Sequence, residues 1–219
     1  MTTRLLCLVG AAALIGCGGS APGIAHRMPM EKIWHTPAAE RDPVATAYAH
    51  LSQVQAELEH TRFLQDDVKR RASIARAERD RARAEVRIAE LQADRREASF
   101  LTKLADAATK KLTSSRKESE ATDRKIRWLD AYGRYLDRQV DYLEAESLAA
   151  EAQFELTKAQ VAVKRGVLSK NQGLRPFQSQ AQSAKSRAEA KRRAADAARQ
   201  QSTAAQKAWG GTPQVGPTS

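Results

Sequence analysis

The first residue whose type and position suit covalent chemistry is Cys17, because a cysteine thiol is a nucleophile. It follows an apolar run from Leu5 to Ile15, which begins directly after the positive charge of Arg4. A charged start, a short apolar segment and a small residue before the cut are typical of a secretory signal peptide. The run is too short for a transmembrane helix, which needs about 20 apolar residues. An ordinary signal peptide that ends in Ala11-Ala12-Ala13 stays open as the alternative.

The four residues Leu14-Ile15-Gly16-Cys17 specify a particular kind of signal peptide. They resemble the lipobox of bacterial lipoproteins, in which an apolar residue, a variable position and Gly or Ala precede an invariant cysteine. The resemblance covers residues 1–20 only. It implies that residues 1–16 are removed, that diacylglycerol is attached to the Cys17 thiol, and that the new amine receives a fatty acid such as palmitate. By the same resemblance Gly18, where Asp would retain the protein in the inner membrane, favours the periplasmic face of the outer membrane.

No other pattern in the sequence predicts a catalytic, cofactor or metal site. Cys7 leaves with the signal peptide, so no thiol remains for a disulfide or a metal. The four histidines all lie within residues 26–60 and lack the i, i+4 spacing of a helical metal pair. There is no Gly-rich phosphate loop and no Gly-x-Ser-x-Gly elbow. We therefore expect a protein that is not an enzyme and holds no cofactor.

The composition predicts an all-α protein. Aromatic residues make up only 5% of the 219 residues and charged residues 29%, and the abundance of Ala, Glu, Lys, Leu and Arg is typical of coiled coils and long helices. After Val44 no glycine occurs until Gly133 and no proline until Pro176. We expect a long antiparallel helical hairpin followed by a shorter third helix.

The predicted divisions of the chain are a signal peptide in residues 1–16, a lipidated Cys17 with a flexible tether in 17–43, the hairpin or coiled coil in 44–166, a loop in 167–175, a basic Ala-rich helix in 176–209 and a disordered tail in 210–219. Asp42-Pro43 predicts the start of the first helix, as an N-cap followed by proline at the first helical position.

The tether contains one apolar cluster, formed by Met28, Met30, Ile33 and Trp34. The sequence leaves open whether this cluster docks on the helices or lies at the membrane surface.

Two stripes of apolar residues with alternating 3-4 spacing predict the seams of the hairpin. The stripe from Val44 to Ala93 is interrupted and drifts in register, which suits a helix that packs on more than one neighbour. The stripe from Ile126 to Val161 is the cleaner one, and Gly133 on it is expected to allow close approach of another backbone. The flanking aromatic residues, which we interpret as packing residues, are Trp128, Tyr132, Tyr135 and Tyr142.

The reversal of the hairpin is predicted at residues 113–119. Thr113-Ser114-Ser115 compete for the backbone hydrogen bonds of a helix, and Ser115 with Glu118 forms the capping box that opens a new helix. One uninterrupted rod stays open, since this stretch contains neither Gly nor Pro.

The net charge of +11 becomes +10 once Arg4 is removed, and this predicts anionic partners. Export argues against nucleic acid and favours lipid headgroups, lipopolysaccharide or peptidoglycan; that the charges only keep a long helix soluble remains the alternative. Residues 176–208 hold seven basic and two acidic groups. We expect this helix to fold back near an acidic cluster on the second helix, formed by Asp137, Asp141, Glu144, Glu146, Glu151 and Glu155.

The function expected from these patterns is that of a lipid-anchored cell-envelope protein with a structural or scaffolding role. Its membrane contact is the lipid on Cys17, and its helical seams offer surfaces for protein partners or self-association. Two alternatives stay open. One is a binding module whose basic helix grips peptidoglycan or lipopolysaccharide, and the other is an accessory subunit of an export or efflux assembly.

Overall fold

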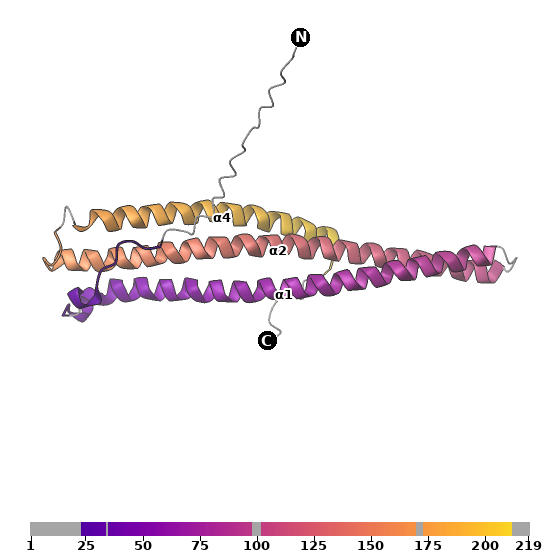
Figure 1. Ribbon diagram of the computed structural model, residues 1–219, viewed down its shortest axis with the longest axis horizontal. Helices are drawn as coiled ribbons and strands as arrows, with labels where there is room; N and C mark the ends of the chain where they lie inside the picture. The colour runs from indigo at the N-terminus through magenta and orange to yellow at the C-terminus, as the bar shows by residue number, and fades with distance from the viewer. Residues whose placement is uncertain (1–22, 34, 98–101, 170–172, 212–219) are drawn as a thin grey trace, which may run out of the picture.

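The computed structural model describes residues 23–33, 35–97, 102–169 and 173–211. These residues form three long α-helices and one short 3-10 helix, and no strand occurs among them. In chain order the elements are η1 (Met30–Ile33), α1 (Ala38–Glu97), α2 (Thr102–Lys164) and α4 (Arg175–Trp209). The predicted all-α fold, with a long helical hairpin and a shorter third helix, is confirmed (Figure 1).

α1 and α2 run antiparallel, as the ion pairs between them show. The sequence separation of the paired residues is 82 for Arg62 and Glu144, 54 for Arg76 and Asp130, and 26 for Arg116 and Glu90. Separations that shrink steadily toward one end are the pattern of a hairpin, because residues equally far from the reversal lie opposite each other.

The reversal lies between Glu97 and Thr102, so the prediction of a turn at residues 113–119 is wrong. α2 is continuous through that stretch, and the hydroxyl of Thr113 donates to the carbonyl oxygen of the residue four positions earlier. Ser115 is buried within α2. Hydroxyl side chains in helices satisfy themselves in this way, and a small residue fits where two helices lie close together.

The position of the reversal decides which large apolar side chains meet. Val54 and Leu58 of α1 pack with Leu143 of α2, and Val68 packs in the same cluster as Leu129. A reversal at residues 113–119 would instead bring Leu143 opposite the region of Ala89 and leave the larger side chains of α1 without partners. Burial of a large aliphatic side chain is worth about 1.5–3 kcal/mol, which outweighs a local capping preference.

α4 packs along α2. Among the described residues, no Cα atom of α4 lies within 8 Å of a Cα atom of α1. Figure 1 shows the three helices side by side over one part of the molecule, while only α1 and α2 continue past the end of α4. We call the three-helix part the base. The part formed by residues 77–97 and 102–127 is called the arm, and its helices extend about 30–40 Å beyond α4 at 1.5 Å per residue.

α4 has the extent predicted for the third helix. Pro176 stands in its first turn, and Gly210 ends it in the left-handed conformation, with φ of 73°. Its buried residues include Ala181, Ala188 and Ala195 at seven-residue spacing, which is the repeat of a coiled-coil seam. The seam of small residues lets α4 lie close to α2, but each contact buries little apolar area.

Aromatic residues dock α4 at both ends. Phe177 is buried. At the other end, the ring of Trp209 stacks on that of Trp128 with 4.6 Å between centroids. Tyr132 lies against the same tryptophan at 5.9 Å, so the interpretation of these aromatic residues as packing residues is confirmed.

The first helix begins earlier than predicted, at Ala38, and includes Pro43 in its second turn. Pro37 lies just before the helix, and its carbonyl oxygen accepts from the backbone N–H of Glu40 at 3.0 Å. In the second turn a residue normally donates its N–H to the carbonyl four positions earlier, here that of Ala39, so Pro43 removes one hydrogen bond from α1 close to its N-terminal end.

The predicted tether is bound to the base over most of its described length. Met28 and Ile33 are almost fully buried, with 4% and 1% of their surface exposed, so the apolar cluster docks on the helices through these two residues. Met30 is partly exposed, and Trp34 lies outside the described residues. The expectation of a flexible segment up to residue 43 is therefore wrong from Ile24 onward.

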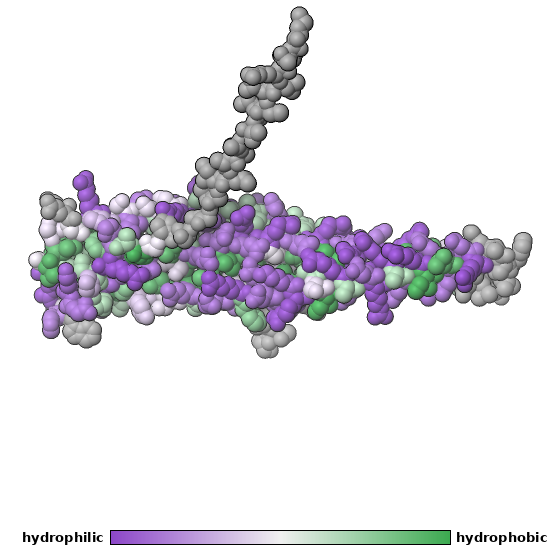
Figure 2. Space-filling view, viewed as in Figure 1, coloured by the Kyte–Doolittle hydropathy of each residue, from purple (hydrophilic) through white to green (hydrophobic). Residues whose placement is uncertain are grey.

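None of the helices in the described ranges is both long and apolar enough to span a membrane. Figure 2 shows apolar side chains scattered among hydrophilic ones along the arm. The large apolar residues of α1 that remain more than half exposed are Tyr48, Phe63, Ile74, Ile88 and Leu91.

Candidate functional site

The one predicted site residue, Cys17, lies outside the described residues. The described chain begins six positions later, at Gly23. Residues 23–28, which we call the strap, lie against the base and connect the predicted anchor to the helices. The contacts of the strap therefore form the candidate functional site.

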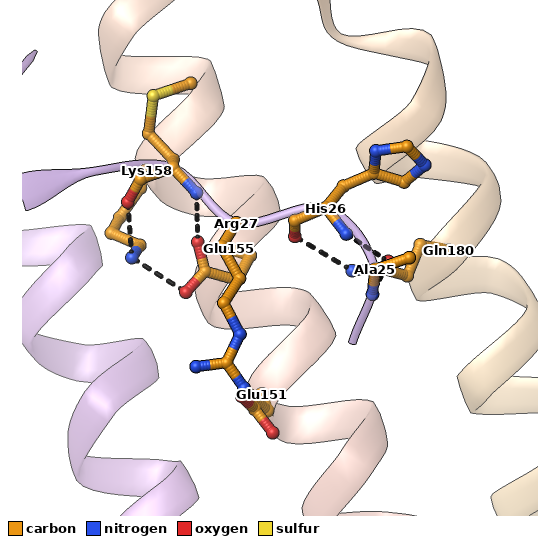
Figure 3. A network of polar contacts seen from close by, with 8 residues as sticks. Ala25, His26, Arg27, Glu151, Glu155, Lys158 and Gln180 are labelled. Carbon is orange, nitrogen blue, oxygen red and sulfur yellow. Dashed lines mark hydrogen bonds and ion pairs between the residues drawn. The ribbon is translucent and has the colours of Figure 1, made fainter. Parts of the chain in front are cut away.

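A buried ion pair on α2 holds the strap at Met28. The Nζ of Lys158 lies 2.7 Å from the carboxylate of Glu155, and each side chain is only 6% exposed. The backbone N–H of Met28 donates to Glu155 Oε2 at 2.6 Å, and Lys158 Nζ donates to the carbonyl oxygen of Met28 at 2.8 Å (Figure 3). Both polar groups of one backbone residue are thus bound by the two members of the ion pair.

The ion pair is stable in this buried position because its charges are fully engaged. Lys158 also lies over the ring of Phe154, 4.6 Å from its centroid, and such cation–π contacts stabilise a desolvated ammonium group. Among the described residues, no buried side-chain nitrogen or oxygen lacks a hydrogen-bond partner. Burial of two charges is costly unless their remaining hydrogen bonds are made, so the pair depends on the strap.

A second set of contacts joins the strap to α4. The side-chain oxygen of Gln180 accepts from the backbone N–H groups of Ala25 and His26, at 3.0 and 2.9 Å, and its side-chain nitrogen donates to the carbonyl oxygen of His26 at 3.2 Å. Arg27 adds an exposed ion pair with Glu151 at 2.7 Å. Figure 3 shows the strap passing between α2 and α4 with these side chains turned toward it.

These contacts recognise the backbone of an extended segment and are largely independent of its side chains. The sequence reasoning placed Glu155 in an acidic cluster and missed Lys158 and Gln180 altogether. The available signal was a second row of small residues on α2, of which Ala152 and Ala159 are fully buried. Such a row predicts that another segment lies close to α2 on that side.

Two grooves flank the contact between α2 and α4. The His50 groove, of about 670 Å³, lies on the side of α1 and is lined by acidic and basic residues that include Glu146, Lys185, Glu189 and Arg192. The Gly23 groove, of about 680 Å³, lies along the strap and has a more apolar lining that includes Leu148.

Burial raises the pKa of the Tyr142 hydroxyl, which lines the His50 groove, and nearby Glu146 raises this pKa further. Burial also raises the pKa of Tyr132. Both phenols are therefore protonated near neutral pH. Within the described ranges, no group of three or more His, Cys, Asp or Glu side chains is placed to hold a metal ion.

α4 folds back near the acidic cluster of α2, as expected, because Asp141, Glu144 and Glu146 line grooves together with residues of α4. The carboxylates of the cluster, however, are divided among α4, α1 and the strap. Only Asp141 forms an ion pair with α4, with Lys191 at 3.4 Å. Glu144 pairs with Arg62 of α1 at 3.0 Å. Glu151 and Glu155, nearer the C-terminal end of α2, bind the strap. α4 does fold back onto α2, but through its alanine seam and its terminal aromatic residues.

Comparison of the chain with protein-family models, with curated proteins and with solved structures finds no match to any of them.

Proposed function

We propose that the chain is a lipid-anchored cell-envelope protein with a structural or scaffolding role, held by acyl chains on Cys17 at the periplasmic face of the outer membrane. The observation that supports this proposal most directly is the strap. It begins only six positions after Cys17. Buried hydrogen bonds fix it to α2, and exposed hydrogen bonds from Gln180 fix it to α4. A force on the lipid is then borne by the folded base and not by a loose linker.

In this proposal the base is the anchored part and the arm is the part that contacts other proteins. The arm carries exposed apolar residues on α1, among them Ile88 and Leu91, and these offer a helical seam for a partner or a second copy. The role is mechanical and requires no cofactor and no nucleic acid.

The anchor is tested by Cys17→Ala in cells supplied with an alkyne analogue of palmitate. The variant should incorporate no label and should leave the detergent phase on Triton X-114 partitioning. Cys7→Ala is the matched control, because it removes the other cysteine and should label as the wild type does. Equal labelling of Cys17→Ala and wild type contradicts the lipid anchor.

The membrane is tested by Gly18→Asp, followed by density separation of the inner and outer membranes. The resemblance to lipoproteins implies that wild type sediments with the outer membrane and that the variant shifts to the inner membrane. If wild type and Gly18→Asp both sediment with the inner membrane, the assignment to the outer membrane is wrong, but the proposed lipid anchor is not contradicted.

The scaffolding role is tested with a photo-crosslinking residue at Leu91 in intact cells. Exposed Val167, three residues beyond the C-terminal end of α2 and far from Leu91 along the hairpin, is the control position. We expect a discrete crosslinked species from Leu91 and none from Val167, and capture at Val167 alone contradicts the assignment of the arm.

A further inference from the structure

The basic side chains of α4 differ from those of the hairpin in having few ion-pair partners. Among the described residues, only one of them forms an ion pair, Lys191 with Asp141. The exposed basic residues of α4 that form none within this part of the chain include Lys185, Arg187, Arg192, Arg193, Arg199 and Lys207. An anion that binds α4 therefore has no internal ion pair to displace.

These cations occupy three positions around the helix. Lys185, Arg192 and Arg199 recur every seven residues and so form one row, and the first two line the His50 groove. Arg193 and Lys207 are fourteen residues apart and share a second row. Around the helix axis, this second row lies about 100° farther from the alanine seam than the first row does, because Arg193 directly follows Arg192 and each residue turns the helix by 100°. Arg187 lines the Gly23 groove on the other side of the seam.

Each groove is lined by two acidic and two basic side chains, and the grooves differ in whether the acidic groups already form ion pairs. In the His50 groove the charges of Lys185 and Arg192 are accompanied by Glu146 and Glu189, which lower the local positive potential. In the Gly23 groove the acidic residues are Asp141 and Glu144, and both already have basic partners. The positive charge of Arg187 is therefore not offset by a free carboxylate in its groove.

The strap brings this second surface close to the proposed anchor. Gly23 and Arg187 line the same groove, and six residues span at most about 20 Å when fully extended. A lipid on Cys17 therefore holds the Gly23 groove within about 20 Å of the bilayer surface. The groove lies about 25–35 Å from the C-terminal end of α2 at 1.5 Å per residue. The segment that carries the lipid is therefore attached to the side of the base and not to its end.

We propose that the surface of α4 carrying Arg187, Arg193 and Lys207 binds anionic lipid headgroups, so that the base lies along the membrane. This inference rests on the proposed lipid anchor, and it names the second membrane contact and the orientation of the molecule. Basic residues near an anionic membrane contribute about fivefold in affinity each, and the contribution weakens with salt. The arm then extends along the membrane surface and contacts partners there.

The test uses the unacylated mature chain, residues 17–219 with Cys17→Ser, in vesicle flotation. We expect it to bind vesicles of phosphatidylglycerol and phosphatidylethanolamine, to ignore phosphatidylcholine alone, and to dissociate as salt is raised. The triple variant Arg187→Gln/Arg193→Gln/Lys207→Gln should lose roughly a hundredfold or more in affinity.

The matched control is Lys185→Gln/Arg192→Gln/Arg199→Gln, which removes the same charge from the first row and should lose less than tenfold. All six residues are exposed, so both variants should keep the wild-type helicity by circular dichroism. Equal losses in the two variants, or no binding to the anionic vesicles, overturn the proposal.

Retention on peptidoglycan or lipopolysaccharide that only the control triple abolishes also overturns it, in favour of a polymer in the His50 groove. Failure of the vesicle test is distinct from failure of the anchor, because palmitate labelling of Cys17 is measured separately in cells.

Discussion

The base and the arm share α1 and α2, but α4, η1 and the strap pack against them only in the base, and the two parts differ in the side chains that they bury. In the base, large side chains such as Ile33, Leu156 and Phe177 are buried. The ion pair between Glu155 and Lys158 is buried there as well. In the arm, the buried positions are mostly small, as at Ala82 and Ala89. Since burial of apolar area supplies most of the free energy of folding, the base should be the stable part and the arm the part that opens locally.

The two parts also use charge differently. The arm is crossed by exposed ion pairs such as Arg83 with Asp123 and Lys125 with Glu78, and exposed pairs of this kind each contribute at most about 1 kcal/mol. The ion pair between Glu155 and Lys158 in the base is almost fully buried and binds the backbone of another segment. Location, and not the number of ion pairs, therefore decides which charges matter for stability.

The largest effect is expected from breaking the buried pair. Lys158→Met leaves the carboxylate of Glu155 buried without its cation, and loss of one partner of a buried pair costs about 3–5 kcal/mol. Urea unfolding followed by circular dichroism measures the change. The double variant Glu155→Gln/Lys158→Met should recover much of the loss, and a single-variant cost below about 1 kcal/mol would contradict the role assigned to the pair.

The next effect tests how the base retains α4. Phe177→Ser/Trp209→Ser removes the aromatic side chains at both ends of the alanine seam. Truncation of a buried aromatic such as Phe177 costs about 3–5 kcal/mol, and Trp209 is only partly buried. Amide exchange across 176–209 should lose its protection, while the hairpin keeps its own. A peptide of residues 176–209 should be largely unstructured in water, because isolated helices depend on packing. Unchanged protection in the double variant would show that other contacts dock α4.

A smaller effect of opposite sign is expected at Gly133. A Cβ added there would meet only the side-chain atom Val68 Cγ1, at 3.8 Å, which is ordinary van der Waals contact, so the close approach of another backbone expected at Gly133 is not found. Gly133→Ala should raise the free energy of unfolding by about 0.5–1 kcal/mol, because alanine favours the helix. Urea unfolding is the measurement, and a destabilised variant would mean that α1 lies closer to α2 than this contact indicates.

The smallest effect is expected in the arm. Arg83→Gln removes one exposed ion pair with an N–O distance of 3.4 Å, and such a change should alter the free energy of unfolding by less than about 0.5 kcal/mol. A loss comparable to that of Lys158→Met would remove the distinction between the two parts of the molecule.

Several features of the fold follow from the sequence alone, because they depend on neighbours within one or two helical turns. The 3-4 stripe from Ile126 to Val161, the proline in the first turn of α4 and the glycine that ends it are all local signals. Together they predicted the all-α class, the hairpin and the extent of the third helix. The packing role of Trp128 and its neighbours also followed, since aromatic residues at helical spacing on an apolar seam have few other uses.

Only the tertiary structure decided where the chain reverses and what holds the strap. A capping box at Ser115 is a local preference of about 1 kcal/mol, whereas the choice of register between α1 and α2 sums the burial of many side chains along both helices. The contacts of Glu155 and Lys158 with Met28 join residues more than a hundred positions apart. Local periodicity carries no information on such pairs, because their free energy exists only once α2 and the strap lie side by side.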